Sequence, residues 1–131
     1  MMNKTIIETK NAPTAIGAYS QAVKVNHTVY LSGQIPLDPK TMKIPDGGFE
    51  KRVEQVFDNL TAVAKASGGQ LTDIVKLNIY LTDLGNFSQV NKVMEKRWGK
   101  KSLPARACVQ VSALPKNVDV EMDAVMVLSK D

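Results

Sequence analysis

Apolar residues recur at helical spacing in two segments of the chain. The first set starts at Val53 and continues 3, 4, 7, 10 and 11 positions later, before Gly68-Gly69 ends the pattern: Val53, Val56, Phe57, Leu60, Val63 and Ala64. The second predicted helix runs over 87–98, with Phe87, Val90, Met94 and Trp98 as its buried stripe. Both helices are amphipathic, so each has one face to bury against another layer.

The remaining apolar runs alternate with period two and predict strands. Residues 73–81 show the clearest case, because every second side chain from Val75 to Leu81 is apolar. Strands are expected at residues 5–8, 22–25, 28–32, 73–81, 105–111 and 118–128. Asn26-His27 is a two-residue turn between the second and third, and the proline-rich residues 36–48 are a loop. The order β-β-β-α-β-α-β-β over 1–131 predicts a single α+β domain, in which two helices cover one face of a mixed sheet.

The sheet face away from the helices is predicted to be partly apolar. In the last strand Val125 and Val127 fall on the side opposite the core residues, and Cys108 is expected on that same uncovered face. Both helices are used on the other side. We therefore expect a closed homo-oligomer that covers this face by self-association.

Composition narrows the class of protein. A formal net charge of +4 is spread along the chain, so RNA binding is disfavoured. The longest apolar run is too short for a bilayer span, and no signal-like segment opens the chain. The lone Cys108 has no partner for an internal disulfide. These features favour a cytoplasmic protein with no membrane association.

The sequence lacks the residues that several common catalytic mechanisms and ligand-binding sites need. The only histidine, His27, falls in a turn without a nearby acid, which argues against Ser-His-Asp or Cys-His catalysis. One cysteine and one distant histidine cannot form a zinc site, so no metal is expected. Neither of the glycine-rich nucleotide-binding motifs is present.

One strand carries the best candidate chemistry. Alternation in 105–111 places Arg106, Cys108 and Gln110 on one face, and a guanidinium among apolar neighbours needs an anion. If this strand and the last one pair as a hairpin, Arg106 and Glu121 approach each other on one face. Spacing alone leaves two interpretations open: an ion pair that braces the sheet, or a site for a carboxylate ligand.

Other candidates are weaker on spacing alone. Cys108 has no base within sequence reach, so it is more simply a small apolar residue than a nucleophile. Tyr19 follows Gly17 in a loop where backbone could approach a ligand, or where the ring simply packs. Ser32-Gly33 ends a strand and offers a hydroxyl and an exposed amide, or marks a bulge.

A series of short motifs along the chain connects these candidate residues with a known protein family. The motifs are Asn11-Ala12-Pro13, Ile16-Gly17-Ala18-Tyr19-Ser20-Gln21-Ala22, Leu31-Ser32-Gly33-Gln34-Ile35-Pro36, Asp58-Asn59-Leu60, Asp73-Ile74-Val75-Lys76, Pro104-Ala105-Arg106-Ala107-Cys108-Val109, Leu114-Pro115-Lys116 and Val120-Glu121-Met122-Asp123-Ala124. Over nearly the whole chain the sequence resembles the Rid family of imine deaminases. The main departure is Ala18, where the family motif commonly has proline.

The resemblance implies a fold, an assembly and a site. The fold is chorismate-mutase-like, and three copies form a trimeric barrel with clefts between subunits. Arg106 matches the residue that holds the substrate carboxylate, and Glu121 matches the acid that positions water, aided by the backbone carbonyl of Cys108. The remaining substrate-binding matches are Tyr19, Ser32, Gly33 and, less closely, Asn91.

The implied activity is hydrolysis of reactive 2-imino acids, such as 2-iminobutanoate and 2-iminopropanoate released by pyridoxal-phosphate enzymes, to 2-keto acids and ammonia. This chemistry needs no cofactor, because the enzyme only has to orient the acid, place a water and move a proton. Two alternatives stay open: a non-catalytic member that binds small carboxylates with regulatory or chaperone-like effects, and an RNA-acting inhibitor of translation.

Overall fold

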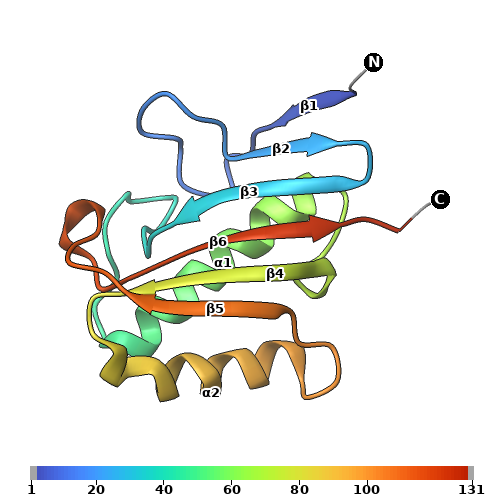
Figure 1. The fold of residues 1–131 in the computed structure, drawn as a ribbon. Coiled ribbons are helices and arrows are strands. Elements are labelled where there is room, and N and C mark those ends of the chain that lie inside the picture. The colour runs from blue at the N-terminus through green and yellow to red at the C-terminus, as the bar shows by residue number, and fades with distance from the viewer. Residues whose placement is uncertain (1–2, 130–131) are drawn as a thin grey trace.

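The computed structural model describes residues 3–129, in which two helices lie on one side of a six-stranded sheet (Figure 1). The strands are β1 (Lys4–Ile7), β2 (Ala22–Val25), β3 (Thr28–Gln34), β4 (Ile74–Leu81), β5 (Ala105–Gln110) and β6 (Val120–Val127), and the helices are α1 (Phe49–Ala66) and α2 (Phe87–Trp98). Three short 3₁₀ turns are η1 (Leu71–Asp73), η2 (Leu84–Asn86) and η3 (Pro115–Asn117). The predicted α+β class and element order are confirmed, with strand ends displaced by at most two residues and α1 beginning four residues earlier than its apolar pattern.

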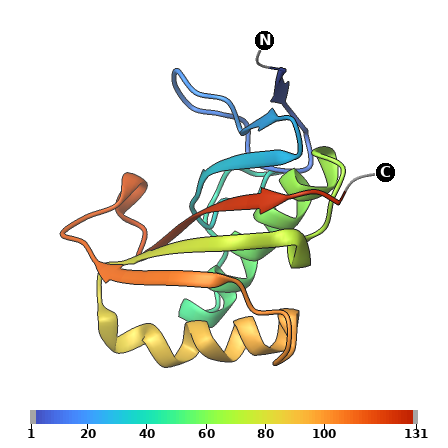
Figure 2. The ribbon, with the colours of Figure 1, turned by 45° about the vertical axis from the view of Figure 1, so that its right-hand side comes forward.

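The strands lie in the order β1-β2-β3-β6-β4-β5 (Figure 2). All neighbours are antiparallel except β4 and β5, which are joined through α2 and run parallel. The two-residue turn at Asn26-His27 is confirmed, and Asn26 supplies its positive φ of 54°.

The β5–β6 hairpin, which was the condition for Arg106 and Glu121 to approach each other, does not form. Strand β4 lies between them, because residues 111–119 form a connection long enough to carry the chain past β4. Strand β6 then pairs with β4 on one side and β3 on the other, which makes β5 an edge strand.

The core fills the space between the helices and the sheet. The six apolar residues that defined the first helical pattern are all fully buried, as predicted, and they pack on inward-facing residues of β4 and β6: Leu77, Ile79, Leu81, Val120, Met122 and Met126. Trp98 at the end of α2 meets Phe57 of α1 edge to face, with ring centroids 5.4 Å apart. Burial of this apolar stripe is the main source of stability for both helices.

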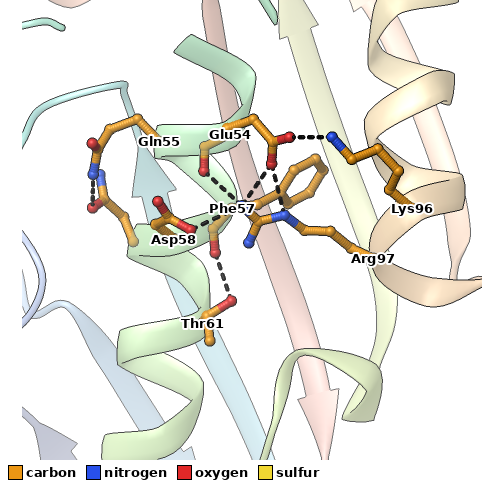
Figure 3. Close-up of polar contacts among 8 residues, drawn as sticks. Glu54, Gln55, Phe57, Asp58, Thr61, Lys96 and Arg97 are labelled. Carbon is orange, nitrogen blue, oxygen red and sulfur yellow. Dashed lines mark hydrogen bonds and ion pairs between the residues drawn. The ribbon is translucent and has the colours of Figure 1, made fainter. Parts of the chain in front are cut away.

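Ion pairs fix the position of α2 against α1 (Figure 3). Arg97 donates to Glu54 at 2.7 Å and to Asp58 at 2.8 Å, and Lys96 donates to Glu54 at 3.0 Å. Burial of Glu54 opposes ionisation, but the hydrogen bonds from Arg97 and Lys96 outweigh it and lower the pKa of this carboxyl. The guanidinium of Arg97 also lies 5.7 Å from the centre of the Phe57 ring. These contacts hold α2 in place against α1, and the side chains on its other faces therefore start from a fixed backbone.

The opposite sheet face is open in a single chain. Tyr30 of β3, Val109 of β5 and Val127 of β6 are all exposed there, as expected for a face that no helix covers. The expectation that Cys108 shares this face is wrong. The β4–β5 register pairs Cys108 with the buried Ile79, so its side chain points to the helix side and packs against the core.

No helix within residues 3–129 has the length and apolar character needed to cross a membrane.

Candidate functional site

A cleft of about 560 Å³ opens beside the end of β3. Its walls come from the loop before β2, the last residues of β3, the η3 turn and the start of β6, and they include Tyr19, Ser32, Gly33, Lys116, Glu121 and Asp123. Four of the site residues predicted from the sequence, Tyr19, Ser32, Gly33 and Glu121, therefore lie together. Much of the remaining wall is apolar, which suits a small organic ligand with a few polar groups.

A bulge in β3 makes room for the Glu121 carboxylate. The β3–β6 register shifts between Leu31 and Gln34, so that Ser32 and Gly33 together face a shorter stretch of β6. A Cβ atom built on Gly33 would lie 2.1 Å from Oε2 of Glu121. Glycine is thus required at this position for the carboxylate to occupy its place over the backbone.

The environment of Glu121 favours its protonated form. The side chain is half-buried, and this burial is the main cause that raises its pKa above the ordinary glutamate value. The negative charge of Asp123, two residues further along the same face of β6, raises the pKa again. Such a carboxyl holds and releases a proton closer to neutral pH than a solvated one, which is useful for acid–base work.

The loop that forms one wall of the cleft is tied down by Gln21. Its buried amide accepts a hydrogen bond from the Thr9 N–H at 2.7 Å and donates to the carbonyls of Thr9 and Pro13 at 3.1 and 2.8 Å. Gln21 was not among the candidate residues predicted from the sequence. Its signals there were its place in a family motif and its position as a polar residue directly before an apolar strand.

Tyr19 lies in this loop, and Ser32 lies in β3 beside it. The Tyr19 hydroxyl accepts a hydrogen bond from the Ile16 N–H at 3.2 Å, and the ring is 49% exposed, so one side of it is available to a ligand. Ser32 Oγ donates to the carbonyl of Ser20 at 2.6 Å and so fastens the loop to β3. Ala18, where the family motif commonly has proline, therefore lies in a loop that the hydrogen bonds of Gln21, Tyr19 and Ser32 hold in place.

Arg106 lies on the other side of the sheet. It pairs with the buried Leu77 in the β4–β5 register, and its guanidinium stacks 4.8 Å from the centre of the Phe87 ring. Nη1 donates to Oδ1 of Asn91 and approaches Met94 Sδ at 3.5 Å. The prediction that Phe87 belongs to the buried stripe of α2 is wrong: Val93 is buried instead, and Phe87 is half-buried beneath Arg106.

Arg106 has no carboxylate partner within residues 3–129. Arg52 pairs with Asp119 and Arg97 pairs with two acids, so Arg106 alone among the three arginines keeps its guanidinium free of an acid. The side chain is exposed, yet Phe87 and Asn91 hold it in one orientation. A fixed, unpaired guanidinium is suited to binding a carboxylate ligand through two parallel hydrogen bonds.

The expectation that Arg106 and Glu121 meet on one sheet face of a single chain is therefore wrong. Arg106 faces α2, Glu121 faces the open side, and β4 separates their strands. The internal Arg106–Glu121 ion pair, one of the two interpretations of the spacing, is excluded on the same ground. The candidate residues therefore fall into two groups, called half-sites below. Arg106 and Asn91 form the half that is predicted to bind a carboxylate, and Glu121, Tyr19, Ser32 and Gly33 form the half that is predicted to do acid–base chemistry.

The two other residues considered for catalysis are Cys108 and His27. Burial raises the pKa of the Cys108 thiol, with the positive charge of Arg106 acting against it, so the thiol is not activated as a nucleophile. The role predicted for its backbone carbonyl stays a prediction. His27 is exposed in the β2–β3 turn, and no cluster of three or more His, Cys, Asp or Glu side chains in the described part of the chain could hold a metal ion.

Several known proteins are similar to this chain in sequence and in fold. RidA from the Antarctic bacterium Psychrobacter sp. is 48% identical in sequence and superposes with a TM-score of 0.90, over 95% of this chain and 99% of that one. A 2-iminobutanoate/2-iminopropanoate deaminase of Dermatophagoides farinae is 43% identical over 98% of this chain and 99% of its own length. A RutC family protein of Pyrococcus abyssi is also 43% identical, over 95% and 97%.

The family described as Endoribonuclease L-PSP matches residues 9–128, which include both half-sites. The chain therefore belongs to this family, the Rid family that its motifs resemble.

Proposed function

We propose that this protein hydrolyses 2-imino acids to 2-keto acids and ammonia, in clefts formed between the subunits of a homotrimer. The observation that carries the proposal is the unpaired, oriented guanidinium of Arg106 on one face and the proton-holding carboxyl of Glu121 on the other. Relatives at about 43% identity that bear the name 2-iminobutanoate/2-iminopropanoate deaminase support it.

A second copy of the chain would complete each half-site. Arg106 and Asn91 of one subunit would bind the substrate carboxylate, and Tyr19, Ser32, Gly33 and Glu121 of the next would surround the imine carbon. The Cys108 carbonyl would add a second acceptor for the attacking water. The open sheet face, with Tyr30 and Val127 exposed, would be covered in the same assembly.

The reaction then needs only positioning and proton transfer. Glu121 accepts a proton from a water molecule whose oxygen bonds to the imine carbon, and it passes this proton to the imine nitrogen, which gives a neutral carbinolamine. Glu121 then takes the proton of the carbinolamine hydroxyl as the carbonyl forms, and returns it to the nitrogen as the C–N bond breaks, so that ammonia leaves. Fixing the carboxylate on Arg106 makes the attack effectively intramolecular, which is where the rate gain comes from.

The test is a trapping assay. An amino-acid oxidase or threonine dehydratase generates fresh imine, and semicarbazide captures whatever imine survives; wild-type protein should suppress the captured fraction. Arg106→Lys should lose most of the effect, because an ammonium cannot reproduce the planar two-point contact and cannot stack on Phe87 in the same way. Lys100→Ala, which removes an exposed charge just beyond α2, is the matched control and should behave as wild type.

Full activity of Arg106→Lys would refute the guanidinium clamp. If wild-type protein leaves trapping unchanged for imines of several amino acids, the proposed deaminase activity is refuted. Binding of small carboxylates would then become the leading function.

A further inference from the structure

A polar trio on the open sheet face lies beside Glu121. Asp123 of β6 accepts a hydrogen bond from Asn78 Nδ2 at 2.8 Å on Oδ1 and from the Tyr80 hydroxyl at 2.9 Å on Oδ2. Both donors come from β4, where they are the polar positions of its alternating pattern. The two carboxylate oxygens are thus each held by one donor, and the side chain is fixed in one orientation.

The register puts this fixed carboxylate next to the acid–base half-site. Asn78 pairs directly with Asp123, and Tyr80 pairs directly with Glu121, so the Tyr80 hydroxyl reaches diagonally back to Asp123. Asp123 and Glu121 project from the same face of β6 two residues apart, about 7 Å along the strand. Both line the same cleft.

We infer that Asp123, held by Asn78 and Tyr80, is a positioning residue for Glu121: its fixed negative charge makes the neighbouring carboxyl a stronger proton acceptor. The inference rests on the proposed function, in which Glu121 takes a proton from water and returns it. A glutamate with ordinary acidity is a poor base at neutral pH, and the Brønsted relation rewards a carboxyl that binds its proton more tightly.

Within residues 3–129, four other titratable groups pair with Glu121 or line the same cleft. They are Tyr80 from β4, Asp123 from β6, Lys116 from the η3 turn and Tyr19 from the loop before β2. Lys116 is exposed, and solvent screens its charge. Asp123 is half-buried and both of its carboxylate oxygens accept hydrogen bonds, so it supplies a fixed negative charge beside Glu121, consistent with the raised pKa of Glu121. The hydrogen bond to Asp123 likewise raises the pKa of Tyr80, which keeps its hydroxyl protonated as the donor.

The trio could instead only brace β4 against β6. The two roles are separated by Asp123→Asn, which keeps the shape and an acceptor for Tyr80 but removes the charge. The titration of Glu121 is followed through its carboxyl ¹³C signal, one of five glutamates in the chain, assigned by its loss in Glu121→Gln. We expect the Glu121 midpoint to move to lower pH in Asp123→Asn and to return toward the wild-type value in Asp123→Glu.

Two further variants complete the test. Tyr80→Phe keeps the Asp123 charge but releases one oxygen, so it should move the Glu121 midpoint in the same direction by less. Asp46→Asn, in the exposed loop before α1, makes the same change in net charge and should move nothing. In the trapping assay, the acidic limb of the kcat/KM profile should follow the midpoint to lower pH, and the plateau of Asp123→Asn should fall by about tenfold.

An unchanged Glu121 midpoint in Asp123→Asn overturns the inference, whatever happens to activity. A midpoint that moves while the acidic limb stays in place also overturns it, because Glu121 titration would then not govern the rate. Wild-type protein without deaminase activity refutes the proposed function, and with it the catalytic meaning of the trio, while the titration still reports whether the two carboxyls interact.

Discussion

Replacing Gly33 by alanine should disable the acid–base half-site while leaving the fold intact. The new Cβ would lie 2.1 Å from Oε2 and 3.1 Å from Cδ of Glu121. Glu121 Oε2 is the free end of a flexible side chain, so it can rotate away without moving the backbone. Gly33 is not among the residues with positive φ, and alanine can therefore adopt its conformation.

The size of the effect follows from the displacement. Ordinary contact begins at 3.4 Å, so Oε2 must move by about 1.3 Å from its present place. A displacement of about 1 Å in a catalytic group costs on the order of 100-fold in rate. We therefore expect kcat/KM of Gly33→Ala to fall by about 100-fold. Its free energy of unfolding should stay within about 1 kcal/mol of wild type, because alanine also lowers the entropy of the unfolded chain.

The assay is imine trapping combined with chemical denaturation, and the control is a double-mutant cycle. In a Glu121→Ala background the Gly33→Ala change has no carboxylate to displace, so it should cause no further loss of activity. Wild-type activity of Gly33→Ala would refute the assignment of Glu121 in its present position. An equal further loss in the Glu121→Ala background would show that Gly33 acts on something else.

Three further predictions concern stability. Gln21→Ala removes a buried amide that makes several hydrogen bonds, and should cost about 1–3 kcal/mol in denaturant unfolding; an unaltered midpoint would show that the loop before β2 is fixed in another way. Leu60→Ala, at a fully buried position of α1, should cost about 2–5 kcal/mol, and a loss below this range would mean that the core closes around the cavity. Because Arg97 and Lys96 lower the pKa of Glu54 in the folded state, this group stabilises the protein above its unfolded-state pKa, and the contribution is lost as pH falls through the lower folded-state value. Glu54→Gln should lack that part of the acid dependence of unfolding free energy, and identical pH curves for the two proteins would contradict the ion-pair account.

Local pattern was enough to predict the elements. The helical spacing of apolar residues predicted α1 correctly, because a helix that packs on a core must bury one stripe of its surface. Every member of that stripe is buried. The start of α1 at Phe49 was missed because its first turn follows two glycines and carries charge, so the apolar period begins only at Val53. Phe87 was misplaced because an apolar residue at helical spacing can serve equally as core or as a platform for Arg106.

Strand neighbours were not predictable in the same way. Chain order favours a β5–β6 hairpin, but β6 fits between β3 and β4, where its inward residues complete the core. A pairing of this kind depends on long-range packing and leaves no local mark in the sequence. The error carried over to the site, because which face Arg106 shares with another residue depends on its neighbouring strand.

The candidate site residues could be picked out from the sequence, but their arrangement could not. Arg106 and Glu121 stood out as charges within apolar strands, and the family resemblance added Tyr19, Ser32, Gly33 and Asn91. The structure divides these residues between two faces, which turns one predicted intrachain contact into two half-sites. The Asn78–Tyr80–Asp123 trio was visible only as the polar side of two alternating patterns.

The central claim, that each active cleft takes Arg106 from one subunit and Glu121 from another, is tested most directly by mixing two inactive variants. Arg106→Ala and Glu121→Gln, each with a different affinity tag, are co-expressed and purified through both tags, so that every trimer contains both variants. In a cyclic trimer each mixed assembly then has one cleft with both residues intact, and activity should recover to about one-third of wild type. Each variant purified alone should remain inactive. A mixed sample as inactive as its parents would contradict the shared cleft.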